Sequence, residues 1–173
     1  MGLKDNMATT YDKIATTTLS STSATITFSS IAASWTDLRL VLVWKPTSSS
    51  SMNPFFRINN DSTTLYSDTY LTGNGTDASS GRDTASSAWF VNQVINPSTS
   101  IFTFTTVDYF SYADSTFKTA LINTSANFNG SGYTQPQVGL YRSTTAITQV
   151  NIVASSDSFA IGTTATLYGI LKA

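Results

Sequence analysis

Apolar and polar residues alternate one by one along much of this chain, which is the period of a half-buried β-strand. The alternation is clearest in residues 24–28 (ATITF), where Ile26 and Phe28 fall on one face and the threonines on the other. Residues 38–44 (LRLVLVW) are instead nearly all apolar. Such a run is typical of a strand covered on both faces, so we expect a central strand there, buried on both sides.

Clusters of Gly, Pro, Asn, Asp and Ser interrupt the apolar stretches at short, regular intervals. The longest cluster, residues 73–83, is rich in Gly and Asp and is expected to form an exposed loop. The best helical candidate is a single turn near residues 31–35. The pattern therefore predicts an all-β protein, an antiparallel β-sandwich of the jelly-roll kind with ten or eleven strands. The expected strands are residues 14–19, 24–28, 38–44, 55–58, 65–71, 87–95, 101–110, 117–123, 136–141, 147–154 and 165–170.

Length and composition indicate one globular domain. The chain has 173 residues, of which 40% are hydrophobic and 12% aromatic, so it is long enough to bury a core and too apolar to be disordered. We expect residues 1–10 to form a flexible N-terminal arm, because they are polar and lack the strand pattern, and residues 11–173 to form a single β-sandwich domain. The arm does not resemble a secretory signal, and Met7 leaves open whether residues 1–6 belong to the natural chain.

Composition excludes several kinds of chemistry. The chain holds 30 threonines and 26 serines but no His and no Cys, so imidazole, thiolate and disulfide chemistry are absent. Nine basic and ten acidic residues give a net charge of −1, which offers no positive field for nucleic acid. No apolar run reaches about 18 residues, the length of a membrane-spanning helix. We expect a protein that is not an enzyme and has no metal, cofactor, nucleic-acid or membrane partner.

Four aspartates around the predicted loop are candidate calcium ligands, because Ca²⁺ prefers six to eight oxygen ligands. The spacing of an EF-hand loop is absent, however, and turn chemistry accounts for these residues better. The residues are Asp61, Asp68, Asp77 and Asp83.

Trp35 and Asp37 lie at the entrance to the apolar strand 38–44. One interpretation makes them a ligand contact. In the other, Trp35 closes one end of the sandwich and Asp37 accepts hydrogen bonds from nearby backbone N–H groups. We favour the structural interpretation, because buried aromatic residues and aspartate-stabilised turns are common.

Asp108 and Asp114 lie close to Tyr109, Phe110 and Tyr112, and paired carboxylates beside aromatic rings are the elements of a glycan-cleaving site. A small sandwich offers no deep cleft, so we place catalysis well below a structural role.

Other candidate features are weaker. Gly73 and Gly75 lack the helix and lysine of a phosphate-binding loop. Tyr133, between Gly132 and Pro136, is expected to be an exposed loop aromatic. A Ser–Lys nucleophile stays open, although no lysine lies in a nucleophile motif. The lysines are Lys4, Lys13, Lys45, Lys118 and Lys172.

Three segments of the chain form a recognisable series: residues 25–38 (TITFSSIAASWTDL), residues 66–75 (YSDTYLTGNG) and the C-terminal residues 165–173 (ATLYGILKA). Together and in this order they resemble virion structural proteins of tailed bacteriophages. The resemblance spans the chain from about Tyr11 to Ala173. The specificity of the resemblance comes from the order and spacing of the three segments.

The resemblance implies a structural component of the virion. The first expectation is a capsid decoration or head-fibre protein that docks on the major capsid protein or other virion proteins. The alternative is a tail-fibre or receptor-binding module that recognises a glycan or protein of the host surface. We also expect a homo-oligomer, most simply a trimer, because sandwich edges gain stability when a second copy covers them.

Overall fold

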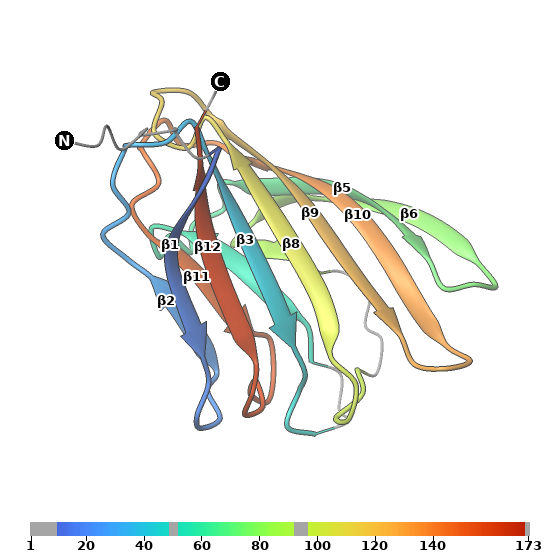
Figure 1. The fold of residues 1–173 in the computed structure, drawn as a ribbon. Helices are drawn as coiled ribbons and strands as arrows, with labels where there is room; N and C mark the ends of the chain where they lie inside the picture. The colour runs from blue at the N-terminus through green and yellow to red at the C-terminus, as the bar shows by residue number, and fades with distance from the viewer. Residues whose placement is uncertain (1–9, 49–51, 92–96, 172–173) are drawn as a thin grey trace.

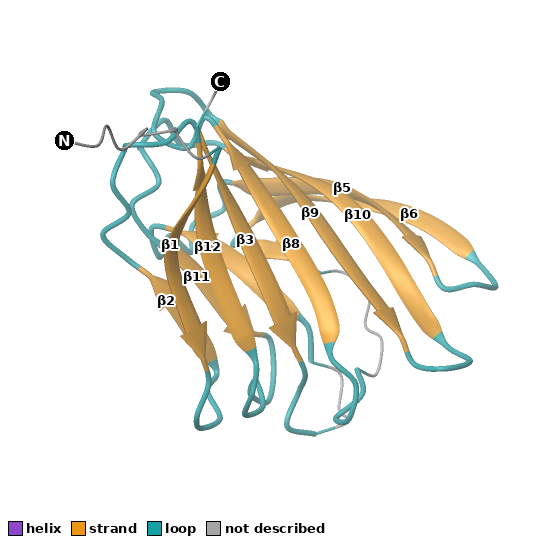
Figure 2. Cartoon of the chain, in the orientation of Figure 1, coloured by secondary structure: helices purple, strands orange, loops and turns teal. Residues whose placement is uncertain are grey.

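The computed structural model describes residues 10–48, 52–91 and 97–171. Nearly all of the predicted arm, residues 1–9, therefore lies outside the described residues. Every regular element that the structure describes is a β-strand, and the two sheets are antiparallel throughout (Figures 1 and 2). The prediction of an all-β antiparallel sandwich is confirmed. Residues 31–35, the best candidate for a helical turn, form an irregular connection between β2 and β3.

The larger sheet has eight strands in the order β1-β12-β3-β8-β9-β10-β5-β6. Its strands are β1 (Tyr11–Thr18), β3 (Asp37–Trp44), β5 (Tyr66–Gly73), β6 (Ala78–Ser86), β8 (Thr103–Phe110), β9 (Lys118–Asn127), β10 (Gly132–Tyr141) and β12 (Thr164–Ile170). The smaller sheet has four strands in the order β2-β11-β4-β7. These are β2 (Thr25–Phe28), β4 (Pro54–Ile58), β7 (Trp89–Phe90) and β11 (Val150–Ala154).

The chain crosses repeatedly between the two sheets, as β2 to β3, β3 to β4 and β4 to β5 illustrate (Figure 1). The hairpin β9–β10 and the pair β1–β12 widen the larger sheet. The structure thus establishes the sandwich, while the jelly-roll connectivity stays an expectation. No helix of the described residues is long and apolar enough to cross a membrane.

The core lies between the sheets and is made by alternate residues of each strand. On β3 the inward side chains Leu38, Leu40, Leu42 and Trp44 have no exposed surface. They face buried residues of the smaller sheet, such as Phe56 and Ile152, in one apolar cluster. The outward residues of the same strand are half-buried. The prediction that β3 is central holds, but the prediction that both of its faces are buried is wrong, because nothing in the described chain covers the outer face of the larger sheet.

The hairpin β5–β6 projects beyond the smaller sheet (Figure 1). Strand β6 is therefore solvent-exposed along most of its length. The predicted exposed loop 73–83 is correspondingly wrong in extent, because the turn spans only residues 74–77 and Asp83 lies within β6. A strand that is exposed to solvent on both faces needs no alternation of apolar and polar residues, so this sequence pattern does not indicate β6.

Tyr133 also differs from expectation. It is the second residue of β10, faces the interior and is 5% exposed, so the prediction of an exposed loop aromatic is wrong. Strand β10 begins before Pro136, whereas the sequence analysis begins the strand at that proline.

Candidate functional site

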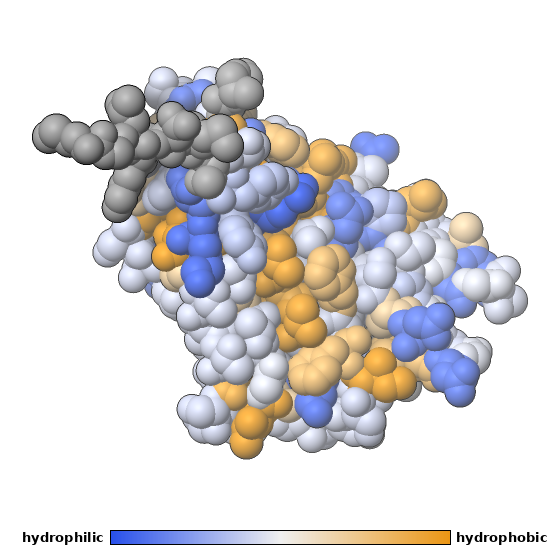
Figure 3. Space-filling view, viewed as in Figure 1, coloured by the Kyte–Doolittle hydropathy of each residue, from blue (hydrophilic) through white to orange (hydrophobic). Residues whose placement is uncertain are grey.

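The outer face of the larger sheet carries large apolar side chains that the described chain leaves uncovered. Strand alternation directs one residue in two outward, and on β5, β8, β9 and β10 five of these outward residues are large, apolar and 37–53% exposed. They come from β5, β8, β9 and β10, and they are Leu71, Phe104, Phe110, Leu121 and Val138. We call this set, with the half-buried Val41 and Val43 of β3, the outer apolar face. Figure 3 shows apolar surface running across the middle of this side of the molecule.

The register of the strands brings these side chains together. Val138 of β10 lies directly opposite Leu121 of β9, and Phe104 of β8 lies opposite Val43 of β3. Opposite residues on one face of an antiparallel pair have their Cβ atoms about 5 Å apart. Leu121 and Val138 therefore form one apolar cluster and Phe104 and Val43 another, and the polar pair Thr106–Asn123 lies between them.

A shallow groove of about 500 Å³ opens on this face between β9, β10, β5 and β6. Leu71, Leu121, Pro136 and Val138 supply its apolar lining, and no residue that lines it carries a charge. A neighbouring hollow of about 340 Å³ shares Val138 and extends toward Arg82 of β6. An uncharged apolar groove suits an apolar side chain of another protein better than an ionic ligand.

The charges of Arg39 and Asp108 on this face neutralise each other. Arg39 and Asp108 are opposite each other on β3 and β8 and form a bidentate ion pair, with Nε–Oδ1 at 2.5 Å and Nη2–Oδ2 at 2.8 Å. The hydrogen bonds to Asp108 raise the pKa of the Arg39 guanidinium above its usual value. Arg39 also donates to the Tyr11 hydroxyl at 3.0 Å. The pair lies beside Leu121, which is opposite Asp108 on β9, so the apolar surface borders a neutral polar edge.

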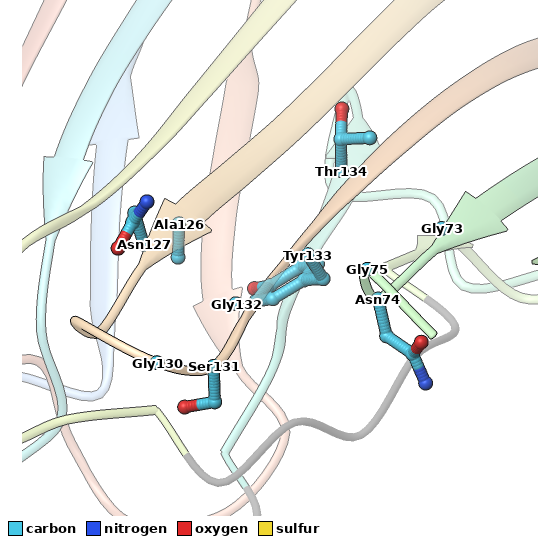
Figure 4. Close-up of a pocket in the computed structure, with 10 residues that line it drawn as sticks. All are labelled: Gly73, Asn74, Gly75, Ala126, Asn127, Gly130, Ser131, Gly132, Tyr133 and Thr134. Atoms are coloured by element: carbon cyan, nitrogen blue, oxygen red, sulfur yellow. The ribbon is translucent and has the colours of Figure 1, made fainter. Parts of the chain in front are cut away.

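A second hollow, of about 410 Å³, lies where the tips of the β5–β6 and β9–β10 hairpins meet (Figure 4). Glycines and asparagines line most of it, and Tyr133 is its single aromatic residue. Gly75 and Gly130 have φ values of 90° and 114°, a backbone conformation that favours glycine. The glycines at this tip therefore serve the turns, and they are not a phosphate-binding loop, since β6 and not a helix follows Gly75.

Asp68 and Asp83 are the two predicted calcium ligands that the structure brings together. They are opposite each other on β5 and β6, and Asp68 is 5% exposed on the inner side of the sheet. Burial, and then the negative charge of Asp83, raise the pKa of Asp68 to about 7, against a hydrogen bond with Gln137 that lowers it. Near pH 7 the Asp68 carboxyl is therefore only partly ionised.

The other two predicted calcium ligands lie in separate turns. Asp61 accepts hydrogen bonds from the backbone N–H and the hydroxyl of Thr63 and from the hydroxyl of Tyr141 at 2.7 Å. These hydrogen bonds lower the pKa of Asp61 even though burial opposes them. Asp77 lies in the β5–β6 turn, where its carbonyl accepts the N–H of Asn74. In the described part of the chain, no three acidic residues come close enough to hold a metal ion.

The structure supports the structural interpretation of Trp35 and Asp37. Asp37 accepts the backbone N–H of Ser111 at 2.7 Å, which ties the start of β3 to the end of β8. Trp35 is half-buried against the core and donates its Nε1–H to Asp12 at 3.3 Å. A Cβ added to Gly169 would lie 2.2 Å from the Trp35 ring, so Gly169 allows the indole to rest on the backbone of β12.

Asp108 and Asp114 do not form a catalytic pair. Asp108 is paired with Arg39 on the outer face, whereas Asp114 lies in the turn between β8 and β9. The aromatic residues near them divide between two faces, because Tyr109 and Tyr112 are fully buried and Phe110 is exposed.

Lys118 is the buried lysine of the candidate Ser–Lys set. Its Nζ donates to the backbone carbonyls of Asp114 and Thr116, so it closes the turn between β8 and β9. Lys4 and Lys172 lie outside the described residues.

Comparison with family models, with curated proteins and with solved structures finds no match to this chain. The site therefore depends on the geometry alone. The sequence analysis missed the outer apolar face, although a signal was present: in β8, Phe104 and Phe110 fall on the face opposite to Val107 and Tyr109. Apolar residues on both faces of a strand indicate either cover on both sides or a contact surface.

Proposed function

We propose that this chain is a structural component of a tailed-phage virion, a capsid decoration or head-fibre protein that acts through protein contacts and not through catalysis. The observation that carries the proposal is the outer apolar face. It spans strands β3, β8, β9, β10 and β5, its groove is uncharged, and the Arg39–Asp108 ion pair that borders it is neutral. Exposed apolar surface of this extent is typical of a site that another protein covers.

The disposition of the polar residues supports the same role. The aspartates that looked chemically useful in the sequence serve turns or an ion pair, as Asp37, Asp61 and Asp108 show. Hydroxyl ladders such as Thr16–Thr166 and Thr18–Thr164, each 3.1 Å, join β1 to β12. A domain built in this way gains durability from strand pairing and burial. The resemblance of the three sequence segments to phage virion proteins is the reason for proposing that this role is played in a virion.

Loading onto particles tests this proposal. Particles that lack the chain are mixed with purified full-length protein or with a variant that lacks the N-terminal arm, residues 1–10, and bound protein is measured after sedimentation. We propose that the arm grips the particle while the sandwich domain folds without it. We therefore expect full-length protein to bind and the truncated variant, still folded by circular dichroism, to bind far less. Immunogold labelling then separates the alternatives, since label on the tail tip and not on the head would support a tail-fibre or receptor-binding module instead.

A further inference from the structure

We infer that a second copy of this chain covers the outer apolar face, so that two sandwiches pack through their larger sheets about a two-fold axis. This inference rests on the proposed role of the face as a protein contact and names the partner. Face-to-face packing of sheets about 10 Å apart is a standard way to bury such a surface.

The first argument is the distribution of charge. One row of directly opposite residues runs across the outer face through Arg39, Asp108, Leu121, Val138, Thr69 and Arg82. The middle of the row is apolar, and the one acidic residue is already paired with Arg39. Arg82 lies at the outer edge of the sheet, on β6. Two copies can therefore meet at the centre of the face without burying an unpaired charge, which is the main electrostatic obstacle to self-association.

The second argument is area. Strands β3, β8, β9, β10 and β5 are adjacent in the sheet, and β8 has eight residues. With strands about 4.8 Å apart and a rise of about 3.4 Å per residue, these five strands present about 650 Å². Two copies would then bury about 1,300 Å² together, which is close to the lower limit of about 1,200 Å² for specific protein interfaces. We therefore expect a dimer that dissociates on dilution.

The third argument is shape. The groove beside Leu121 and Val138 is open and uncharged, whereas Phe104 and Phe110 stand 45% and 37% exposed on the neighbouring strand β8. A face that carries both an apolar hollow and apolar projections can pack against its own copy, with the projections of each copy entering the hollow of the other. A two-fold pair differs from the trimer expected from the sequence, because a face that meets the same face of its partner closes with two copies.

Sedimentation of the full-length chain as a function of concentration tests the inference. We expect wild-type protein to shift from monomer to dimer, and Leu121→Asp or Val138→Asp to raise the dissociation constant at least about tenfold, because each buries a carboxylate in the contact. The matched control is Ile161→Asp, which alters a residue that is 59% exposed in a loop at the end of the sandwich. It is expected to leave the equilibrium unchanged.

Cross-linking keeps the test independent of how well the aspartate variants fold. The chain has no cysteine, so the single variants Leu121→Cys and Val138→Cys place one thiol each on the face. We expect at least one of them to form a disulfide-linked dimer under mild oxidation, and Ile161→Cys to stay monomeric.

Any of three results would overturn the inference. The wild-type protein could stay monomeric at every concentration, it could form a trimer, or it could form a dimer that only the Ile161 variants disturb. None of these results involves particles, so they leave the proposed virion role standing. If the protein dimerises as expected but does not load onto particles, the virion role fails and the inference about the face stands.

Discussion

Truncation of Leu40 to alanine tests whether the sandwich core lies on one side of β3. Leu40 has no exposed surface, and its neighbours across the sheet, Val107 and Leu167, have none either. The change removes three carbon groups, which at about 0.8 kcal/mol each amounts to about 2.4 kcal/mol of lost burial. A cavity term of similar size follows where the surroundings do not collapse, so the expected loss lies between about 2.5 and 5 kcal/mol. We expect a value in the upper half, because strands on both sides hold the backbone of β3 in place.

Val41→Ala is the matched control on the same strand, since its side chain points to the outer face and is half-buried. It removes two carbon groups next to open space, so we expect a loss of about 1 kcal/mol or less. Both changes are made in the Val138→Asp background, which keeps self-association out of the comparison, and stability is measured by urea unfolding. Equal losses of unfolding free energy in the two variants would refute one-sided burial. If both losses were large, β3 would be buried on both faces, and if both were small, β3 would not belong to the core.

Three further outcomes follow from the structure. Asp68 has a pKa of about 7 in the folded protein and near 4 in the unfolded chain, so the folded state binds the proton more tightly and the free energy of unfolding should fall as the pH rises from about 4 to about 7. Asp68→Asn should flatten that part of the pH profile measured by urea unfolding. A profile that the variant leaves unchanged would contradict the buried carboxyl. Gly169→Ala should lower the free energy of unfolding by about 1–3 kcal/mol, because the added Cβ would displace Trp35. The control Gly73→Ala should lower it by less, because a Cβ there has no neighbour closer than 4.0 Å. Equal melting temperatures for the two variants would mean that the indole does not rest on β12. Dialysis against a strong chelator should leave the melting temperature unchanged, because Asp61 is already engaged by Thr63 and Tyr141, and a drop of several degrees restored by Ca²⁺ would show that the aspartates bind metal after all.

Strand positions were predictable where one face of a strand is buried and the other is wet. Residues 25–28 and 164–167 alternate in burial as their sequence alternates in polarity. Strand β6 (Ala78–Ser86) was not predictable, because the hairpin extends past the smaller sheet and neither face selects apolar residues. Its pairing with β5 follows from the short turn at residues 74–77, in which the Asn74 side chain accepts the N–H groups of Thr76 and Asp77.

The outer apolar face was also beyond the sequence analysis, for a different reason. The run in β3 was interpreted as two-sided burial, which is the usual meaning of such a run inside one chain. The half-burial of Val41 and Val43 shows that the second side is exposed in a single copy. A contact surface between chains and a buried sheet face have the same sequence pattern, and only the structure distinguishes them.

The candidate polar sites were separated only by the structure. Asp61, Asp77 and Asp83 look like one oxygen-rich cluster in the sequence, yet they lie in a turn after β4, in the β5–β6 turn and in β6. Proximity along the chain is a poor guide in a sandwich, where neighbours in space come mainly from distant strands.

The number of copies of this chain per particle is the measurement that bears most directly on the proposed virion role. Quantitative mass spectrometry of purified virions from a phage that encodes the chain gives its ratio to the major capsid protein. A decoration or head-fibre protein predicts many copies, in a fixed ratio to the capsid lattice. A chain that is absent from purified virions would contradict the account, and a few copies per particle would contradict the decoration role.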